Sequence, residues 1–219
     1  MQLFELAAKA GIKCIIYTSS TAVNDRVYMD NKAREQGELN TVYEHTKQNP
    51  VTYYGATKGS AELYLKAIGF SYKIRTNIVR PGYTFDNPAV QGGDIESDTR
   101  FADIMVKALS HQPIEQIKND GTQFIAARDL AKIYTAILDS DADNKMYFGL
   151  GNRFITWEKI TYDAIALTRS NSKVVIKDLG WPDKPALFDV EAIHRDFNMS
   201  FDCRDKIMEH LKYLVSLYK

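Results

Sequence analysis

A strand, a helix and a second strand follow one another early in this chain, and their order limits the fold more than any other feature. "KCIIYTSS" (13–20) is a short, apolar, β-branched run that turns polar, as expected of a strand buried on both faces that ends at the edge of a parallel sheet. "YYGATKGSAELYLKAIG" (53–69) predicts a helix that ends at Gly69, and "YKIRTNIVRPG" (72–82) predicts a second buried strand that ends at a Pro-Gly pair. This spacing is that of a βαβ unit, which favours an α/β fold with a parallel sheet.

The other segments predict further helices and strands around this unit. A helix over 2–10 opens the chain and ends before Gly11. Thr156 is placed to cap the helix that follows it. Residues 24–52 are polar and charge-mixed and predict a long loop with a short helix over 30–36. We expect further helices at 99–109, 128–140, 157–168 and 203–218, and strands at 122–127, 144–151 and 172–180.

Composition excludes several classes of protein. The 219 residues suffice for one substantial core, in one domain or one and a half. The 28 basic and 28 acidic residues cancel, so no net field favours nucleic acid or an anionic membrane, and no apolar run is long enough to span a bilayer. The four histidines lack ligand spacing, so we expect no metal site. Cys14 and Cys203 belong to no Cys-x-x-Cys pair, and a reduced, cytoplasmic setting is the simplest interpretation.

A tyrosine four residues before a lysine occurs three times, at 28–32, 43–47 and 54–58. The first copy lies in a segment without an apolar face, and Pro50 would interrupt a helix that continued from the second. Only the third begins a long helix between two predicted strands. The apolar stripe expected to dock that helix on the sheet consists of Ala56, Leu63 and Ala67. The context therefore selects the third copy.

Tyr54 and Lys58 share one face of the predicted helix because residues i and i+4 are neighbours there. A tyrosine that acts as a base near neutral pH needs a pKa about three units below its ordinary value near 10, or roughly 4 kcal/mol. A nearby ammonium in a partly desolvated cleft can supply much of this difference. A third group must hold the substrate oxygen, and "YTSSTAV" offers hydroxyls at the carboxyl end of the preceding strand, where open α/β sheets bind ligands.

These residues carry a family resemblance. "IIYTSSTAV", "YYGATKGSAELYL" and "IVRPGYTF", with "DGTQFIAARDLAKIYTAIL" and "MYFGLGNRFITWEKI" later on, resemble the extended short-chain dehydrogenase/reductase family, the NAD-dependent epimerase/dehydratase group. The resemblance implies that Ser20, Tyr54 and Lys58 are the catalytic set, with Ser19 as the alternative hydroxyl. It also implies that Lys58 holds the nicotinamide ribose of NAD or NADP and that the backbone at Pro81–Gly82 borders the nicotinamide.

The glycine-rich turn that cradles the pyrophosphate in this family has no match here. The nearest start, Gly149 and Gly151, has Phe154 in place of the third glycine. The resemblance implies the back half of a doubly wound sheet, a partial Rossmann-like fold that lacks roughly the first hundred residues of a complete enzyme. Residues 1–85 would form the incomplete NAD(P)-binding portion, and residues 86–219 a mixed C-terminal substrate-binding portion with elements that return to the main sheet. We expect this chain alone to bind dinucleotide weakly or not at all.

The substrate class is less defined. Dehydratases of the family follow the catalytic hydroxyl with Asp and Glu, whereas Thr21 and Ala22 follow Ser20, which favours an epimerase or a reductase. A nucleotide sugar is the substrate that the resemblance suggests. However, Asn24-Asp25 and "RPGYTF" depart from the epimerase pattern, and Arg128 does not match the arginine that holds the phosphates. Relatives dimerise through the tyrosine-bearing helix and its neighbour, so the resemblance also suggests a homodimer.

Other interpretations stay open. The chain could be a non-catalytic relative that serves as a binding or regulatory module, or a subunit that completes its sheet with another chain. Asp129 is expected to be a structural residue at a helix start, and Trp157 a core aromatic. The charged loop at 24–52 could shape a substrate pocket or be a solvated loop.

Overall fold

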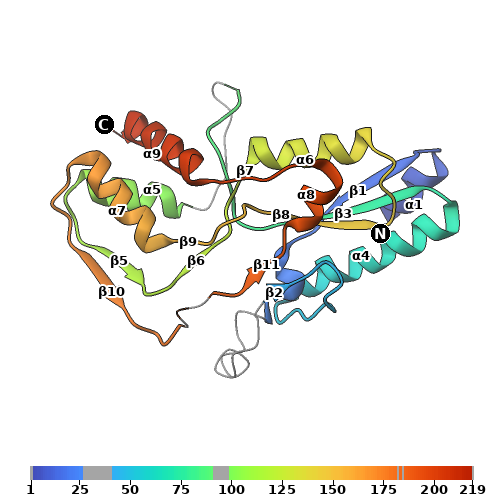
Figure 1. Ribbon diagram of the computed structural model, residues 1–219, viewed down its shortest axis with the longest axis horizontal. Helices are drawn as coiled ribbons and strands as arrows, with labels where there is room; N and C mark the ends of the chain where they lie inside the picture. Colours follow the sequence, from blue (N-terminus) through green and yellow to red (C-terminus); the bar gives the residue numbers. More distant parts are fainter. Residues whose placement is uncertain (1, 27–40, 91–98, 182, 184, 219) are drawn as a thin grey trace.

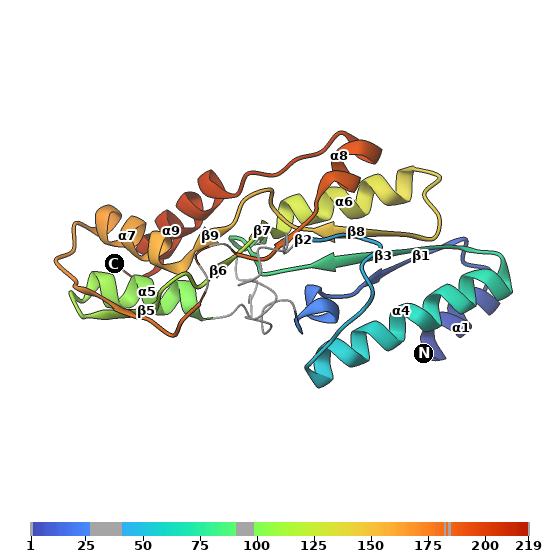
Figure 2. The same cartoon turned by 60° about the horizontal axis from the view of Figure 1, so that its bottom comes forward.

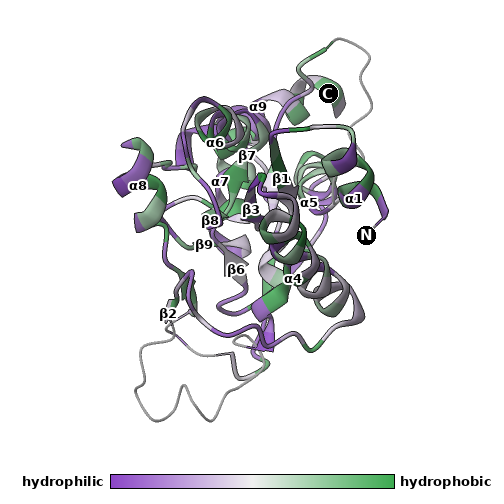
Figure 3. Cartoon of the chain, turned by 90° about the vertical axis from the view of Figure 1, so that its right-hand side faces the viewer, coloured by the Kyte–Doolittle hydropathy of each residue, from purple (hydrophilic) through white to green (hydrophobic). Residues whose placement is uncertain are grey.

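The computed structural model describes residues 2–26, 41–90, 99–181, 183 and 185–218. A parallel sheet with the strand order β1-β3-β8 lies between two layers of helices (Figures 1 and 2). The strands of this sheet are β1 (Cys14–Thr18), β3 (Arg75–Pro81) and β8 (Lys145–Gly149). One face is covered by α1 (Gln2–Lys9) and α4 (Tyr53–Tyr72), and the other by α6 (Ala127–Asp139) and α8 (Glu191–Phe197). The view along the long axis shows the sheet between α4 and α6 (Figure 3).

The predicted βαβ unit is confirmed. β1, α4 and β3 follow in order, and β1 pairs with β3 in parallel, from Cys14 opposite Arg75 to Thr18 opposite Val79. The middle of β3 is buried, but β1 is not buried on both faces as expected: its first four residues are half-buried and Thr18 is exposed. β1 is only partly buried because it lies at the edge of the sheet, where, among the described strands, it pairs only with β3.

The C-terminal end of α4 differs from the prediction. The helix continues past Gly69 and is capped by Lys73, whose φ of 53° lies in the left-handed region. Gly69 is buried within the helix, and a Cβ there would lie 2.6 Å from Thr76 Oγ1. This glycine therefore allows close packing of the helix on β3 instead of ending the helix. At α1, by contrast, Gly11 follows the last turn with a φ of 81°, as expected.

The buried face of α4 is also not the predicted stripe. Ala56, Leu63 and Ala67 are exposed. The residues that face the protein are Gly55, Gly59, Glu62, Leu65, Ile68 and Gly69. This prediction was wrong because three glycines and a carboxylate occupy much of the buried face, and neither residue type contributes to an apolar pattern.

The part of the molecule away from the main sheet is built around an aromatic core (left in Figure 1). Its helices are α5 (Arg100–Leu109), α7 (Trp157–Thr168) and α9 (Arg204–Tyr218), and its parallel strand pair is β5 (Ile114–Ile117) with β10 (Val174–Lys177). Trp157 is 3% exposed in this core, which confirms its structural assignment. Thr156 caps α7 as predicted by accepting a hydrogen bond from the Lys159 N–H at 3.1 Å.

Three pairs of two-residue strands complete the described strand pairings. They are β2 (Thr41–Val42) with β11 (Leu187–Phe188), β4 (Thr84–Phe85) with β7 (Ile125–Ala126), and β6 (Gly121–Thr122) with β9 (Ile155–Thr156). The single strand predicted at 122–127 is therefore two strands. Between them, the buried Gln123 side chain donates to the carbonyls of Gly151 and Phe188, at 3.1 and 3.0 Å. The short helix predicted over 30–36 lies outside the described residues.

Candidate active site

The carboxyl ends of the three parallel strands bring the predicted site residues to one edge of the sheet. Thr18 at the end of β1 lies opposite Val79, and Pro81 at the end of β3 lies opposite Gly149. The Ser19 N–H continues this ladder by donating to the Val79 carbonyl at 2.7 Å. Residues that follow β1 and β3 are therefore held next to each other, and this edge is where open α/β sheets bind ligands.

Lys58 is anchored at this edge from the second turn of α4. Its Nζ donates to the Thr18 carbonyl oxygen at 2.9 Å. The same nitrogen lies 5.7 Å from the ring centroid of Tyr54 and 5.2 Å from that of Tyr17. Tyr54 and Lys58 therefore lie on the same side of the helix, with the ammonium at the end of β1.

The first turn of α4, which carries Tyr54, is fixed to the segment after β1. Thr52 caps the helix by accepting from the Gly55 N–H at 3.0 Å, and its own hydroxyl donates to Asp25 Oδ2 at 2.7 Å. A Cβ on Gly55 would lie 2.1 Å from the Ala22 carbonyl oxygen, so only glycine allows this approach of the backbones. The Tyr54 side chain itself is 56% exposed.

Ser20 and Ser19 have different surroundings. Ser20 is the N-cap of a 3₁₀ turn, η1 (Thr21–Asn24), where its half-buried hydroxyl accepts from the Ala22 N–H at 3.1 Å. The Ser20 proton is then available for a hydrogen bond to another oxygen. Ser19 is 2% exposed, and its hydroxyl donates inward to Glu62 Oε1. The geometry therefore favours Ser20 over Ser19 as the hydroxyl that could contact a ligand.

Two further tyrosines lie beside Lys58 or Thr18. Burial raises the pKa of Tyr17, and the charge of Glu62 adds to this effect. Burial also raises the pKa of Tyr134, whose hydroxyl is 2.8 Å from Thr18 Oγ1. A raised pKa is the opposite of the shift that a tyrosine base needs near neutral pH, so neither phenol is favoured as a base at this edge.

Pro81 is the last residue of β3, and Gly82 follows it at the same edge. A Cβ on Gly82 would lie 2.3 Å from Leu150 Cδ2, so the absence of a side chain lets the turn after β3 pack on the segment after β8. The structure thus brings Ser20, Lys58 and the Pro81–Gly82 backbone to neighbouring strand ends, with Tyr54 one helical turn before the lysine.

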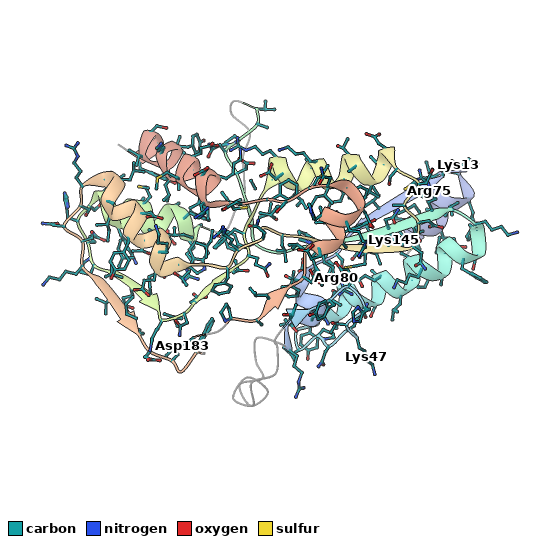
Figure 4. The ribbon with its side chains drawn as sticks, viewed as in Figure 1. Lys13, Lys47, Arg75, Arg80, Lys145 and Asp183 are labelled. Atoms are coloured by element: carbon teal, nitrogen blue, oxygen red, sulfur yellow. The ribbon has the colours of Figure 1, made fainter. Side chains whose placement is uncertain are left out.

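Sequence reasoning missed the buried polar residues beneath this edge. Arg80, immediately before Pro81, forms an ion pair with Glu62 at 2.6 Å, and both side chains are almost fully buried. Figure 4 shows Arg80 at the opposite end of β3 from Arg75. The available signal was a glutamate one helical turn after Lys58, on the face of the helix that carries no apolar pattern.

A cavity of about 560 Å³ lies beyond β4 and is lined by Thr84, Asp86, Pro88, Arg128 and Ala131, among others. Arg128 pairs here with Asp86 at 3.0 Å and with Glu209 at 2.9 Å. Asp129, the next residue, is buried in the first turn of α6 and accepts from Lys132 Nζ at 2.6 Å, as expected of a structural residue.

Within the described ranges, no group of three or more His, Cys, Asp or Glu side chains is placed to hold a metal ion. The described helices also include none that is long and apolar enough to cross a membrane.

A parallel sheet with helices on both faces and polar residues at its carboxyl edge defines a Rossmann-type α/β protein. More specifically, the chain belongs to the NAD dependent epimerase/dehydratase family, whose sequence model matches residues 1–148. The family resemblance is thereby confirmed. A search of curated proteins found no match.

Solved structures agree on the fold. UDP-glucuronic acid 4-epimerase from Bacillus cereus, in complex with NAD, has a TM-score of 0.75 at 16% identity over 100% of this chain and 66% of its own. UDP-glucose 4-epimerase from Thermotoga maritima, with UDP-glucose, has a TM-score of 0.77 at 16% identity over 99% and 68%. dTDP-glucose 4,6-dehydratase from Bacillus anthracis, with NAD, has a TM-score of 0.74 at 14% identity over 98% and 65%. The chain thus spans about two thirds of the length of these structures.

Proposed function

We propose that this chain carries the proton-transfer part of an NAD(P)-dependent site that acts on a hydroxyl-bearing carbon, as in epimerases and reductases. The observation that carries the proposal is the position of the Lys58 ammonium, bound to the Thr18 carbonyl at the end of β1 and 5.7 Å from the Tyr54 ring. Ser20, Tyr54 and Lys58 are the proposed catalytic residues. Tyr54, Lys58, Pro81 and Gly82 are the proposed contacts with the cofactor.

Each of these residues has a role that its chemistry permits. Lys58 has three donor hydrogens, of which Thr18 uses one, so two can hold the ribose hydroxyls of a dinucleotide. Tyr54 would take the proton from the substrate hydroxyl, while Ser20 donates a hydrogen bond to the same oxygen. A bound NAD or NADP would supply hydride transfer.

The fit to the cofactor differs between its two ends. The donors of Lys58 suit the nicotinamide ribose. For the pyrophosphate, none of the 12 glycines forms the spaced turn that would cradle it. We therefore propose that this chain by itself contacts mainly the nicotinamide end of the dinucleotide and binds it weakly.

A nucleotide sugar is the substrate class we propose to test first, because the epimerase neighbours are enzymes of UDP-sugars. Thr21 and Ala22 after Ser20 supply no additional acid or base for eliminating water, which favours epimerase or reductase chemistry over dehydratase chemistry. The cavity beyond β4 is a candidate for the sugar-nucleotide end. There Arg128 already pairs with Asp86 and Glu209, so the phosphates would compete with two carboxylates.

We propose a homodimer through α4 and α1. Its support is the apolar surface that these helices leave exposed, which includes Leu3, Leu6, Leu63 and Phe70. The division at residue 85 into a cofactor-binding and a substrate-binding portion stays a prediction, as does a cytoplasmic location, which the two free cysteines support.

A non-catalytic binding or regulatory module is the second candidate function. The observation that favours it is the missing glycine turn, because a chain that binds dinucleotide weakly could retain the fold without turnover. A subunit whose sheet is completed by another chain is the third candidate. It is supported by the position of β1 at the edge of the described sheet.

Substitution of Tyr54 tests the proposal. In an epimerisation assay with UDP-glucose and UDP-glucuronic acid at millimolar NAD, Tyr54→Phe should lower turnover by about a hundredfold or more, the usual contribution of a proton-transferring group. Tyr53→Phe is the matched control, because Tyr53 is the neighbouring residue and is 95% exposed. Near-full activity in Tyr54→Phe would exclude the proposed role.

A further inference from the structure

A single buried carboxylate, Glu62 on α4, collects hydrogen bonds from several segments of the chain. Its side chain is 1% exposed, and its two oxygens accept four hydrogen bonds. Arg80 donates two of them, from Nε to Oε1 at 2.8 Å and from an Nη to Oε2 at 2.6 Å. Gln48 Nε2 donates to Oε2 at 2.8 Å, and the Ser19 hydroxyl donates to Oε1.

Glu62 and two of its donors, Ser19 and Arg80, lie in the three segments that carry the proposed site residues. Ser19 directly precedes Ser20, Arg80 directly precedes Pro81, and Glu62 is one helical turn after Lys58. The third nitrogen of the Arg80 guanidinium donates to Asn24 Oδ1 at 2.7 Å, in the turn that Ser20 caps. The ion pair thus connects the ends of β1 and β3, η1 and α4 through atoms that are shielded from solvent.

Stability alone does not explain a charged pair at this position. Removing two charges from water is costly, and well-packed apolar residues of similar volume are often as stabilising or more so. A bidentate contact between a guanidinium and a carboxylate adds fixed geometry, because two parallel hydrogen bonds define both distance and orientation. Fixed geometry is what a site assembled from three separate segments requires.

We propose that Glu62, paired with Arg80, is a positioning residue that holds α4 in register with the ends of β1 and β3. In this role it keeps Lys58 Nζ on the Thr18 carbonyl and Tyr54 beside the turn of Ser20. Its consequence for catalysis rests on the proposed function, whereas its effect on the position of Lys58 does not. The two can therefore be tested separately.

The test measures how accessible the Lys58 amine is when the pair is absent. The single variant Glu62→Gln leaves Arg80 buried without its counter-charge, so the double variant Glu62→Met/Arg80→Met is the main test. The whole chain is treated with an amine-acylating reagent, and the rates at Lys58 and at Lys66, an exposed residue of the same helix, are compared by peptide mass mapping. The rate ratio should rise about fivefold, the factor that corresponds to one net hydrogen bond. The melting temperature should fall, because Ser19 and Asn24 lose buried hydrogen-bond partners, but the chain should still fold.

A matched control replaces a buried polar residue far from the site. Gln116 is 4% exposed and donates to Thr161 Oγ1 at 2.8 Å in the other part of the molecule, so Gln116→Met should leave the ratio unchanged. A folded double variant with the wild-type ratio would overturn the proposal. A double variant that does not fold would also overturn it, because the pair would then be needed for folding itself. The ratio of acylation rates at Lys58 and Lys66 could rise in the double variant while Tyr54→Phe keeps near-full activity. That result would support the positioning role of Glu62 and reject the proposed chemistry.

Discussion

His210 on α9 is a buried residue whose protonation should make the stability of the fold depend on pH. It is 7% exposed, with ring centroids 5.7 Å from Phe85 and 5.0 Å from Phe101, and its Nδ1 is 2.8 Å from Asn87 Oδ1. Burial lowers the pKa of His210 to about 4, although the nearby charge of Asp86 acts in the opposite direction. The folded protein therefore holds this imidazole in its neutral form at neutral pH.

This shift predicts a loss of stability in mild acid. Because the pKa is lower in the folded than in the unfolded chain, the unfolded chain binds the proton first as the pH falls below about 6.5. His210 should therefore lower the free energy of unfolding progressively from about pH 6.5 to pH 4, by about 3 kcal/mol in total, with no further loss below pH 4. His210→Phe, which keeps a ring between its neighbours, should lack this component in urea unfolding at several pH values.

Tyr213→Phe is the control for this experiment, because it alters only a hydroxyl on the neighbouring ring and should keep the wild-type pH dependence. Equal pH dependence in the wild type and in His210→Phe would show that this histidine is not held neutral by burial.

Residues of the site differed in how well the sequence predicted them. Tyr54 and Lys58 could be predicted because their spacing is local and a helix places residues i and i+4 on one face. The pairing of Glu62 with Arg80 could not, since a strand and a helix bring together charges 18 residues apart and nothing local distinguishes a buried carboxylate from a solvated one. Whether Ser20, Tyr54 and Lys58 are catalytic stays a prediction.

Among the elements, α4 has the clearest difference between pattern and packing. The sequence pattern pointed to Ala56, Leu63 and Ala67, but the helix docks through Gly55, Gly59 and Gly69, where its backbone approaches the neighbouring segments. Glycine has no apolar side chain and adds nothing to a helical hydrophobic pattern. The buried face could therefore not be predicted from hydrophobic spacing. The consequence is an apolar stripe left on the outer surface of the helix.

This stripe leads to a prediction about assembly. If the chain dimerises through α4, Leu63→Asp places a charge in the interface and should shift the protein from dimer to monomer in sedimentation velocity. Val106→Asp on α5, a residue that is 42% exposed, is the control and should sediment as the wild type does. A wild-type chain that sediments as a monomer, or a Leu63→Asp chain that stays dimeric, would contradict the proposed interface.

For the molecule as a whole, the fold class could be predicted from the strand, helix and strand that follow one another early in the chain. Two adjacent parallel strands need a crossover connection, and here a helix provides it. The short strand pairs were not predictable. β2 pairs with β11 and β4 pairs with β7 over two residues each, and pairs this short give no periodic signal in the sequence. Strand β1 was expected to be more buried than it is, because an apolar run does not show whether a strand is central or at an edge.

The most direct test of the central claim is whether the end of β1 and Lys58 contact a nicotinamide dinucleotide. Ligand-observed saturation-transfer NMR with millimolar NADH detects weak binding and reports which protons of the ligand are near the protein. We predict transfer to the nicotinamide and its ribose in the wild type, loss of that transfer in Lys58→Met, and wild-type transfer in Lys66→Met, the exposed lysine two turns further along α4. Equal transfer in Lys58→Met and the wild type, or none in the wild type, would contradict the account.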